Sequence, residues 1–406
     1  MKIVFLTSNY PPEAIAGTEQ VVTALARELR ALGGEIAAIT SSDVVHFGQD
    51  LGREEFEGVA VFRLWKKLGE WDHDGFVRPR LLGLLRERLQ ELRPDLVHVH
   101  SFAALGAGCL RVCRELGIPV VLSFHDLWVV CARYFRLPPA GFVCPSGTDR
   151  TPCIGCIDHA LHAGPAAITG LLAARDEALR AEVALAGACI APSEAAARFV
   201  REGLPYAGQI HVVPHGLLRP VPMTHRSAPP RAGEVLRIGT FGGLVAEKGV
   251  LELVLAVAGL PCELHLAGKF GDPEFAAAVR AQAAQQGTVL HERGRYGPAD
   301  RHPARDLHLA VFPSKCQETY GLVVDEALAH GVPAVVSDHG ALAERRSSPG
   351  VVVTPLSQLA SVLHDLARSP TALAELRAAV PASMPSIAAS AAFHLELYRS
   401  LLRRPS

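Results

Sequence analysis

The chain has 406 residues, of which 49% are hydrophobic, and a formal net charge of −1. A chain of this length is too long for a single domain with one hydrophobic core and fits two domains. The balanced charge argues against a general nucleic-acid binder. No apolar run reaches the length of a membrane span, and the apolar opening is too short for a signal peptide, so we expect a soluble, cytoplasmic protein.

Short apolar runs rich in β-branched residues alternate with helical patterns through the first half of the chain. The runs are KIVFLTS, EIAAITS, DLVHVHS, PVVLSFHD and ACIAPS, and EQVVTALARELRALG is one of the helical patterns. This alternation predicts βαβ units with a parallel sheet and helices on both faces. Residues 80–93, RLLGLLRERLQELR, predict an amphipathic helix that lies either on the sheet or, as an alternative, on a membrane surface.

A second series of strand-like runs follows: VLRIGTFGG, CELHLAG, TVLHERG, LHLAVFPS and PAVVSD. The stretch HGLLRPVPMTHRSAPPRAGEV before it is rich in proline and arginine, as is typical of a linker. We therefore predict two doubly wound α/β domains, over 1–215 and 216–385. A C-terminal helix over 386–406 either packs on the second domain or crosses back to the first. Ligands bind beyond the carboxyl ends of strands in such sheets, so the two domains can face each other across a cleft.

The stretch CQETYGLVVDEALAHGVP places two carboxylates around a glycine that opens a helix. The N–H groups of Gly321, Leu322 and Val323 would form an anion site at the helix N-terminus, where a phosphate binds without side-chain contacts. Glu318 would then reach hydroxyl groups on whatever carries the phosphate, and Glu326 a ribose diol. A sugar nucleotide has these three features in this order. The alternative is a solvated helix with an acidic first turn.

Several blocks in order along the chain resemble glycosyltransferase family 4. They are YPPEAIAGTEQVV, RPDLVHVHS, GIPVVLSFHD, APSEAAARFV, GTFGGLVAEKGVLELVLA, LHLAVFPS and the Glu-x7-Glu stretch PSKCQETYGLVVDEALAHGVPAVVSD. The resemblance covers essentially the whole chain. It implies a GT-B fold, with two Rossmann-like domains facing a cleft, and transfer of a sugar from a nucleotide donor with retention of anomeric configuration. It also implies that no catalytic metal is needed.

The resemblance also implies roles for individual residues. Lys248 in EKG would pair with the leaving diphosphate, while Glu318 holds the donor sugar and Glu326 the ribose. His125 in SFHD would bind a sugar hydroxyl or steady the oxocarbenium-like transition state; a lone histidine at a strand end is otherwise more often structural. Gly17 would lie in a loop whose backbone approaches the phosphate and the acceptor. The remaining donor-binding candidates are Gly242, Arg295, Tyr320, Gly321, Leu322 and Val323. Ser193 either binds near the donor or caps the following helix, and we favour the cap.

One position departs from the family pattern. The family commonly has an arginine beside the glycine before the EKG lysine, whereas this chain has Gly243 there, in FGGLVAEKG. Losing one charge-assisted bond to a phosphate removes roughly 1.5–3 kcal/mol of stabilisation unless another group replaces it. Arg293 and Arg295, in HERGRYG, are the candidates for a replacement.

Four cysteines lie in one insertion over 127–160, with the spacing Cys131-x12-Cys144-x8-Cys153-x2-Cys156. The Cys-x-x-Cys pair can hold one tetrahedral ion, and two further thiolates would complete a closed structural zinc site. An iron–sulfur cluster uses the same ligands and is the next interpretation. Disulfides or four unrelated thiols are the remaining alternatives. The other five cysteines stand among apolar residues, where buried free thiols are common: Cys109, Cys113, Cys189, Cys262 and Cys316.

The leading interpretation is a retaining, metal-independent glycosyltransferase of the hexosyltransferase type. A nucleotide-sugar epimerase of the same fold and a non-catalytic nucleotide-sugar-binding protein are the alternatives. The expected partners are a nucleotide-sugar donor and an acceptor that is a small molecule, a lipid-linked sugar or a polysaccharide, with no nucleic acid. The arginine side of residues 80–93 leaves peripheral contact with the inner face of a membrane open.

Overall fold

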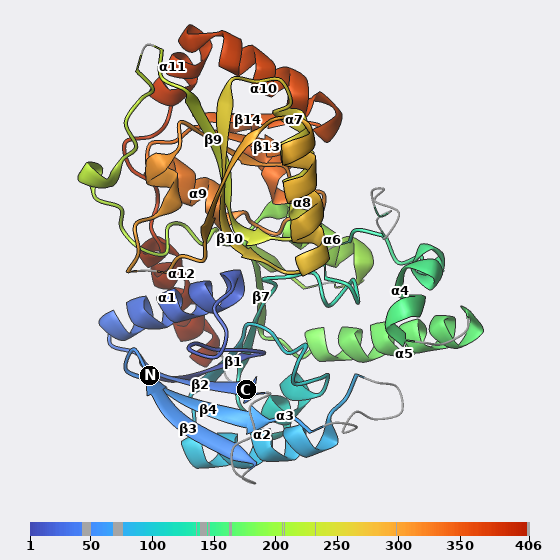
Figure 1. The fold of residues 1–406 in the computed structure, drawn as a ribbon. Helices are drawn as coiled ribbons and strands as arrows, with labels where there is room; N and C mark the ends of the chain where they lie inside the picture. Colours follow the sequence, from blue (N-terminus) through green and yellow to red (C-terminus); the bar gives the residue numbers. More distant parts are fainter. Residues whose placement is uncertain are drawn as a thin grey trace. The chain divides into compact units, whose positions relative to one another are not determined.

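The computed structural model describes residues 1–42, 50–67, 76–134, 136–138, 144, 147–161, 165–204, 206, 208–231, 233–297 and 299–403, without the side chains of 158–161 and 165. Part of the predicted cysteine-rich insertion, residues 135, 139–143 and 145–146, therefore lies outside the described residues. The chain forms two compact units (Figure 1): unit 1 is Met1–Leu218 with Ser386–Ser406, and unit 2 is Arg219–Pro385. The boundary expected after residue 215 lies close to this division.

Unit 1 contains an eight-stranded sheet with the strand order β3-β4-β2-β1-β5-β6-β7-β8. Its strands are β1 (Lys2–Thr7), β2 (Glu35–Ser42), β3 (Leu51–Phe56), β4 (Val59–Trp65), β5 (Leu96–Val99), β6 (Val120–Ser123), β7 (Ala188–Ala191) and β8 (Ile210–Val212). All neighbouring strands are parallel except β3 and β4. The β3–β4 pair is thus an antiparallel addition at one edge of the parallel sheet that the sequence predicts. Glu57 and Gly58 both have positive φ, 48° and 76°, which is the backbone of a tight antiparallel hairpin.

The helices of unit 1 are α1 (Gly17–Ala31), α2 (Pro79–Leu92), α3 (Cys109–Glu115), α4 (Ile154–Leu161), α5 (Pro165–Val183), α6 (Glu194–Gly203) and α12 (Ile387–Leu402). The amphipathic helix expected over 80–93 is confirmed as α2, which begins with a proline at its first position. Leu81, Leu85 and Leu89 lie one turn apart on a single face and are at most 1% exposed. Burying each of these side chains stabilises the unit by about 2 kcal/mol.

The C-terminal helix α12 packs against α1, the first helix of the chain. The Ile387 N–H at its start donates to the Leu217 carbonyl at 2.9 Å. Further along, Tyr398 is fully buried, and its hydroxyl lies 2.6 Å from Nδ1 of His98 on β5. The last helix is therefore part of the core of the unit that contains the first strand.

Unit 2 contains a six-stranded parallel sheet with the order β11-β10-β9-β12-β13-β14. Its strands are β9 (Leu236–Leu244), β10 (Cys262–Phe270), β11 (Val289–Gly294), β12 (Leu309–Phe312), β13 (Ala334–Ser337) and β14 (Val351–Thr354), and its helices are α7 (Val250–Ala256), α8 (Pro273–Gln285), α9 (Leu322–Ala329), α10 (Leu359–Arg368) and α11 (Pro370–Ala378). One apolar cluster joins the sheet to α7, α8 and α10, and a second joins it to α9. Both units are thus α/β, as the alternating pattern predicts.

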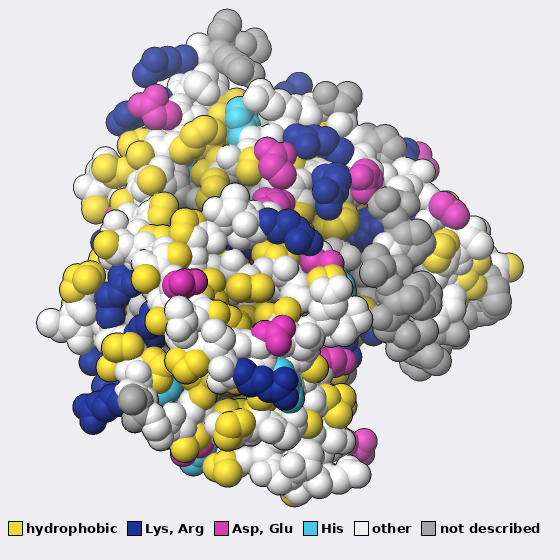
Figure 2. Space-filling model, turned by 90° about the horizontal axis from the view of Figure 1, so that it is seen from above, with side chains coloured by type: hydrophobic (Ala, Val, Ile, Leu, Met, Phe, Trp, Pro, Cys, Tyr) yellow, Lys and Arg dark blue, Asp and Glu magenta, His cyan; other side chains and the backbone are white. Residues whose placement is uncertain are grey.

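Basic and acidic side chains lie next to one another across the face drawn in Figure 2, in keeping with the near-zero net charge. Among the described helices, none combines the length and the apolar character that crossing a membrane requires.

Candidate functional site

The loop after β9 and the loop after β12 meet at the carboxyl end of the unit 2 sheet. Gly249, with a φ of 71°, fixes this contact, because a Cβ at this position would lie 1.8 Å from the Pro313 carbonyl oxygen. The N–H of Lys315 in turn donates to the Glu247 carbonyl at 2.8 Å. This close approach holds Lys248, the residue before the glycine, over the segment that follows β12.

Lys248 and Glu318, predicted separately from two sequence blocks, form an ion pair. Nζ of Lys248 lies 2.5 Å from Oε1 of Glu318, and the Ser314 hydroxyl donates to the same oxygen at 2.7 Å. Burial opposes both charges, but each charge favours the other. The net effect raises the pKa of Lys248 and lowers the pKa of Glu318. Both groups are therefore ionised at neutral pH.

Gly321 is the N-cap residue of α9, as the sequence predicts. Its φ of 88° is left-handed, and a Cβ would approach Leu342 to 2.8 Å, so a glycine is required here. The N–H groups of the first turn, which include Leu322 and Val323, have no acceptor within the helix. They present a partial positive charge beside the Lys248–Glu318 pair.

Tyr320 stabilises the first turn of α9 through its side chain. Its hydroxyl donates to Oδ2 of Asp325 at 2.6 Å, and Arg345 donates to Oδ1 of the same buried carboxylate at 2.7 Å. The Arg345 guanidinium also lies over the Tyr320 ring, 5.1 Å from its centroid. The side chain of Tyr320 is thus used to hold the α9 N-terminus, and the sequence blocks give no sign of its partners.

Glu326 lies on α9 beside two histidines that sequence reasoning missed. Nε2 of His302 is 3.7 Å from Oε2 of Glu326, and the His302 ring stacks on His330 with centroids 4.5 Å apart. Burial raises the pKa of Tyr296, and the negative charge of Glu326 raises it further. Glu326 therefore has imidazole and aromatic groups around it and is not simply a carboxylate surrounded by solvent.

Gly242 and Gly243 lie near the end of β9, next to β10. The carbonyl of Gly242 lies where a Cβ on Gly268 would be, at 1.9 Å, so the two strands approach closely. Gly243 is exposed, with nothing within 4 Å of an added Cβ. Its register partner on β10 is Lys269, which is exposed, and aligned residues of neighbouring strands project on the same side. The position of Lys269 next to Gly243 follows from the strand register and could not be predicted from the sequence blocks.

Of the two arginines expected to replace the family arginine, Arg293 has another partner. Its Nη2 lies 3.2 Å from Nδ1 of His265 on β10. Arg295 follows β11 and is exposed. A cation beside Gly243 is therefore supplied more directly by Lys269 than by Arg293.

His125 follows β6 in unit 1 and belongs to a group of imidazoles. Its Nε2 lies 2.9 Å from Nδ1 of His100, and its ring stacks on His215 at a centroid distance of 5.1 Å. Burial, followed by the nearby His394, lowers the pKa of His125 to about 3. Its imidazole is therefore neutral at pH 7 and acts as a hydrogen-bonding group.

The same group continues into the core of unit 1. The ring of His98 lies 3.8 Å from that of His100 between centroids, tilted by 38°, and its Nε2 lies 2.8 Å from the Ser123 hydroxyl. A cavity of about 10 Å³ lies between His125, His215 and His394. The sequence predicts only His125; the other histidines are spread over almost 300 residues, and no local pattern joins them.

Two further unit 1 predictions can be placed. Gly17 is the exposed first residue of α1, where the preceding loop ends, so its N–H lies at a helix N-terminus, and its approach to a phosphate stays a prediction. The cap predicted at Ser193 is confirmed, since its hydroxyl accepts from the Ala196 N–H at 3.0 Å at the start of α6.

The four insertion cysteines line one cavity of about 30 Å³ in unit 1, although they span 26 positions of the chain: Cys131, Cys144, Cys153 and Cys156. Arg136, Arg150 and Arg175 line the same cavity. Among the described residues, none of the four forms a disulfide. Burial raises the pKa of Cys153 to about 11, and the neighbouring cysteines add to the shift while Arg150 opposes it.

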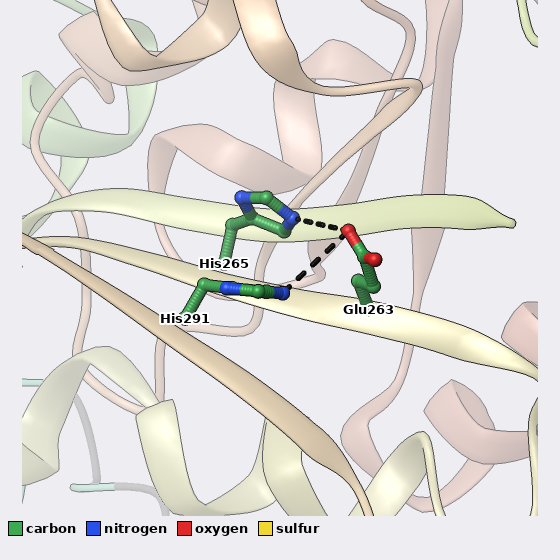
Figure 3. Close-up of side chains that lie close together, drawn as sticks. All are labelled: Glu263, His265 and His291. Carbon is green, nitrogen blue, oxygen red and sulfur yellow. Dashed lines mark hydrogen bonds and ion pairs between the residues drawn. The ribbon is translucent and has the colours of Figure 1, made fainter.

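In the part of the chain that the structure describes, one set of side chains brings three possible metal ligands within 4.8 Å of one another. It consists of Glu263, His265 and His291 on β10 and β11 (Figure 3). No three of the insertion cysteines form such a set in the described part of the chain.

Two family models match the chain. Residues 15–217 match the model of Glycosyltransferase Family 4, and residues 235–369 match Glycosyl transferases group 1. The first match alone covers half of the 406 residues, and the two follow the division into units.

Known proteins with similar sequences or folds include nucleotide-sugar enzymes. The GDP-mannose-dependent alpha-mannosyltransferase of Mycobacterium tuberculosis is 25% identical over 359 residues, 84% of this chain and 80% of that protein. The sucrose-phosphate synthase of Thermosynechococcus elongatus has a TM-score of 0.69 at 18% identity, over 98% of both chains. Anabaena HepE in complex with UDP has a TM-score of 0.67 at 16% identity, over 98% of this chain and 100% of that one. These similarities show the GT-B fold expected from the sequence.

Proposed function

Because this chain belongs to glycosyltransferase family 4, which transfers sugars from nucleotide-sugar donors, we propose that it is a retaining, metal-independent hexosyltransferase that glycosylates an acceptor hydroxyl. The observation that carries the proposal is the group formed by Lys248, Glu318 and Ser314 beside the α9 N-terminus. The group combines a fixed cation, a carboxylate and unpaired helix N–H groups, which are the features that a sugar diphosphate needs.

Lys248 and the helix N-terminus would neutralise the diphosphate as the glycosidic bond breaks. In the protein without donor, Glu318 is the counter-ion that keeps Lys248 charged and in place. A bound diphosphate would supply that negative charge instead and leave Glu318 to accept hydrogen bonds from the donor sugar. Groups already oriented in this way stabilise developing charge without reorganising, which supports catalysis without a metal.

Lys269 would supply the positive charge that the family arginine provides elsewhere. It is exposed and lies in register with Gly243, so its flexible chain can reach the space that a longer side chain at 243 would occupy. Lysine binds phosphate as a point charge and not through two parallel hydrogen bonds, so we expect weaker orientation of the diphosphate than arginine gives.

His125 would bind a sugar hydroxyl as a neutral imidazole. With Nε2 engaged by His100, the ring is fixed in orientation, and its pKa of about 3 excludes a positive charge at working pH. A neutral ring places no repulsive charge near an oxocarbenium-like transition state. A neutral imidazole is compatible with both roles expected for His125, which are binding a sugar hydroxyl and steadying the oxocarbenium-like transition state.

We propose GDP-mannose as the first donor to test. The support is the mannosyltransferase relative, which aligns over 84% of this chain and is named for this donor. The neighbour bound to UDP is 16% identical to this chain, and a likeness at that level carries the fold alone.

Thermal unfolding with GDP, UDP, ADP and dTDP tests the site. A ligand that binds the folded state raises the melting temperature by mass action, so GDP should stand out with wild type and lose its effect with Lys248→Ala. Lys315→Ala is the matched control, because Lys315 lies nearby and pairs with Glu252 at 2.8 Å. Transfer from GDP-mannose, followed by NMR of the anomeric proton, then distinguishes a retained glycoside from an epimerised donor. Binding of no nucleotide would contradict the proposal.

We further propose that the four-cysteine cavity is a structural zinc site. Four thiolates on zinc leave two net negative charges, and the three arginines of the cavity would balance them. Arg136 and Arg175 are 3% and 8% exposed, so their charges are buried beside the thiols. Among the described residues, the apolar cluster at Cys153 and Cys156 contains three buried side chains, Ile157, Ile168 and Leu172. A metal held by the four thiolates would add order to this part of the unit.

The cytoplasm is the proposed compartment, since none of the nine cysteines forms a disulfide in the described part of the chain and structural disulfides are characteristic of oxidising compartments. Arginines of α2 have carboxylate partners in their own unit: Arg80 with Asp50, Arg86 with Glu115 and Arg88 with Glu91. These pairs reduce the free positive charge of this helix. Peripheral membrane contact through α2 stays a prediction.

A further inference from the structure

Glu263, His265 and His291 form a compact group on the unit 2 sheet, apart from the residues assigned to the donor. Glu263 and His265 are the second and fourth residues of β10, and His291 is the third residue of β11. Lys248 and Glu318, in contrast, follow the carboxyl ends of β9 and β12. The group therefore lies within the strands, whereas the residues assigned to the donor lie in the loops that follow them.

Strand geometry fixes the group on one face. Side chains alternate along a strand, so Leu264 and Leu266 enter the core with α7 and α8 while Glu263 and His265 project to the other side. His291 is the register partner of His265 on the parallel strand β11 and projects to the same face. Figure 3 shows both imidazoles turned toward one carboxylate oxygen.

The spacing of the ligand atoms suits a tetrahedral ion. Oε2 of Glu263 lies 3.3 Å from Nε2 of His265 and 3.6 Å from Nε2 of His291. Ligands about 2.0–2.1 Å from a tetrahedral zinc ion lie about 3.3 Å from one another. Two imidazoles and one carboxylate form a ligand set that zinc uses with a fourth position left for water.

The protein without an ion leaves one nitrogen of this group unsatisfied. Nε2 of His291 is a buried atom with no hydrogen-bond partner among the described residues, and its distance to Glu263 is too long for a hydrogen bond.

We propose that Glu263, His265 and His291 bind a divalent ion of the zinc type, which ties the edge strand β11 to β10. β11 is the last strand on its side of the sheet, and its side chains are exposed or only half buried. An ion shared by the two strands would stabilise the pairing of an edge strand. The role is structural and independent of sugar transfer.

Arg293 limits the affinity of this site. A guanidinium only donates, so Nδ1 of His265 accepts from Arg293 and Nε2 carries the proton that points to Glu263. An ion at Nε2 displaces that proton, and Nδ1 must then carry one. Arg293 cannot accept it and has to turn away. Arg293→Gln offers an amide oxygen that accepts from Nδ1–H, so this variant should bind the ion more tightly.

Equilibrium dialysis of the full chain against Zn²⁺, and titration with Co²⁺, test the proposal. Wild type should bind one equivalent more than His291→Ala or Glu263→Gln, and the visible Co²⁺ spectrum of that equivalent should be tetrahedral. It should lack thiolate-to-metal charge transfer, which separates it from any ion held by the cysteines. His364→Ala, which changes a half-buried histidine of the same unit on α10, should bind like wild type.

The expected sizes follow from the ligand set. His291→Ala should weaken this equivalent at least tenfold, and Arg293→Gln should strengthen it about tenfold, the scale of outer-shell effects. Zn²⁺ should also raise the melting temperature of wild type more than that of His291→Ala. Equal binding by wild type, His291→Ala and Glu263→Gln would overturn the proposal. Since His291 is partly exposed, its variant should fold, and unchanged circular dichroism checks this.

Discussion

Nζ of Lys248 lies 2.5 Å from Oε1 of Glu318, a residue 70 positions further along the chain. Each residue is the other's counter-ion, so each single substitution leaves one partly buried charge without its partner. The costs of the two substitutions should therefore not add, as is usual for groups in direct contact. The coupling can therefore be tested by comparing the two single variants with the double variant.

Lys248→Ala should lower kcat for sugar transfer by about 10²–10³-fold, because the leaving diphosphate loses its fixed cation. Glu318→Gln should lower it as well, and the double variant should be little worse than Lys248→Ala alone. Steady-state kinetics with GDP-mannose measures all three. Additive losses in the double variant would mean that the two residues act independently.

Lys269→Ala should weaken GDP binding about tenfold, which corresponds to one charge-assisted contact with phosphate. Gly243→Arg should strengthen it by a similar factor, since the position is exposed and has open space around its Cα. Calorimetric titration with GDP measures both. If Gly243→Arg weakened binding while Lys269→Ala had no effect, the diphosphate would have to lie elsewhere.

Unit 1 should lose stability steeply as the pH falls from 7 to 5. Burial lowers the pKa of four histidines that are at most 8% exposed: His98, His100, His215 and His394. Below pH 6.5 the unfolded chain binds protons that the folded chain does not, so the free energy of unfolding falls as pH falls. The loss is about 1.4 kcal/mol for each such histidine one pH unit below its ordinary pKa.

Two carboxyl groups oppose this trend, because burial raises the pKa of Asp126 to about 6 and also raises the pKa of Glu182. The contribution of each to stability grows as the pH falls through its raised pKa. Two opposing groups cannot offset four histidines. Urea unfolding at pH 7.5, 6.5 and 5.5 measures the slope, and His394→Gln should make it shallower. A slope unchanged by pH would contradict a neutral histidine core.

Cys153→Ser should remove one equivalent of zinc and expose the insertion to protease, because three thiolates hold zinc less tightly than four. Atomic emission of the purified protein and limited proteolysis measure the two effects. Cys109→Ala is the control for metal content, since Cys109 is buried away from the cavity. A visible absorption band typical of iron–sulfur clusters would favour such a cluster over zinc. A disulfide found by mass spectrometry without reductant would favour the disulfide alternative.

The sequence predicts the strands that alternate with helices, since their β-branched runs and flanking glycines are local signals. It misses β3, β4, β8 and β14. β3 is largely polar, and β8 has three residues, too few for a periodic pattern. Lys248, Glu318 and the α9 N-terminus could be found because each lies in a contiguous block. Lys269, His100, His215 and His302 could not, because strand register and long-range packing bring them to their neighbours.

The packing of α12 on α1 has a consequence for the order in which the protein is made. Unit 2, Arg219–Pro385, is one continuous segment and can fold as soon as it leaves the ribosome. Unit 1 begins to emerge first, yet it is completed only when α12 has been made. His98 needs Tyr398 as its hydrogen-bond partner, and the histidine cavity needs His394 as part of its lining. During synthesis the ribosome must therefore release almost the entire chain before the first unit is closed, and until then α1 exposes the apolar face that α12 will cover.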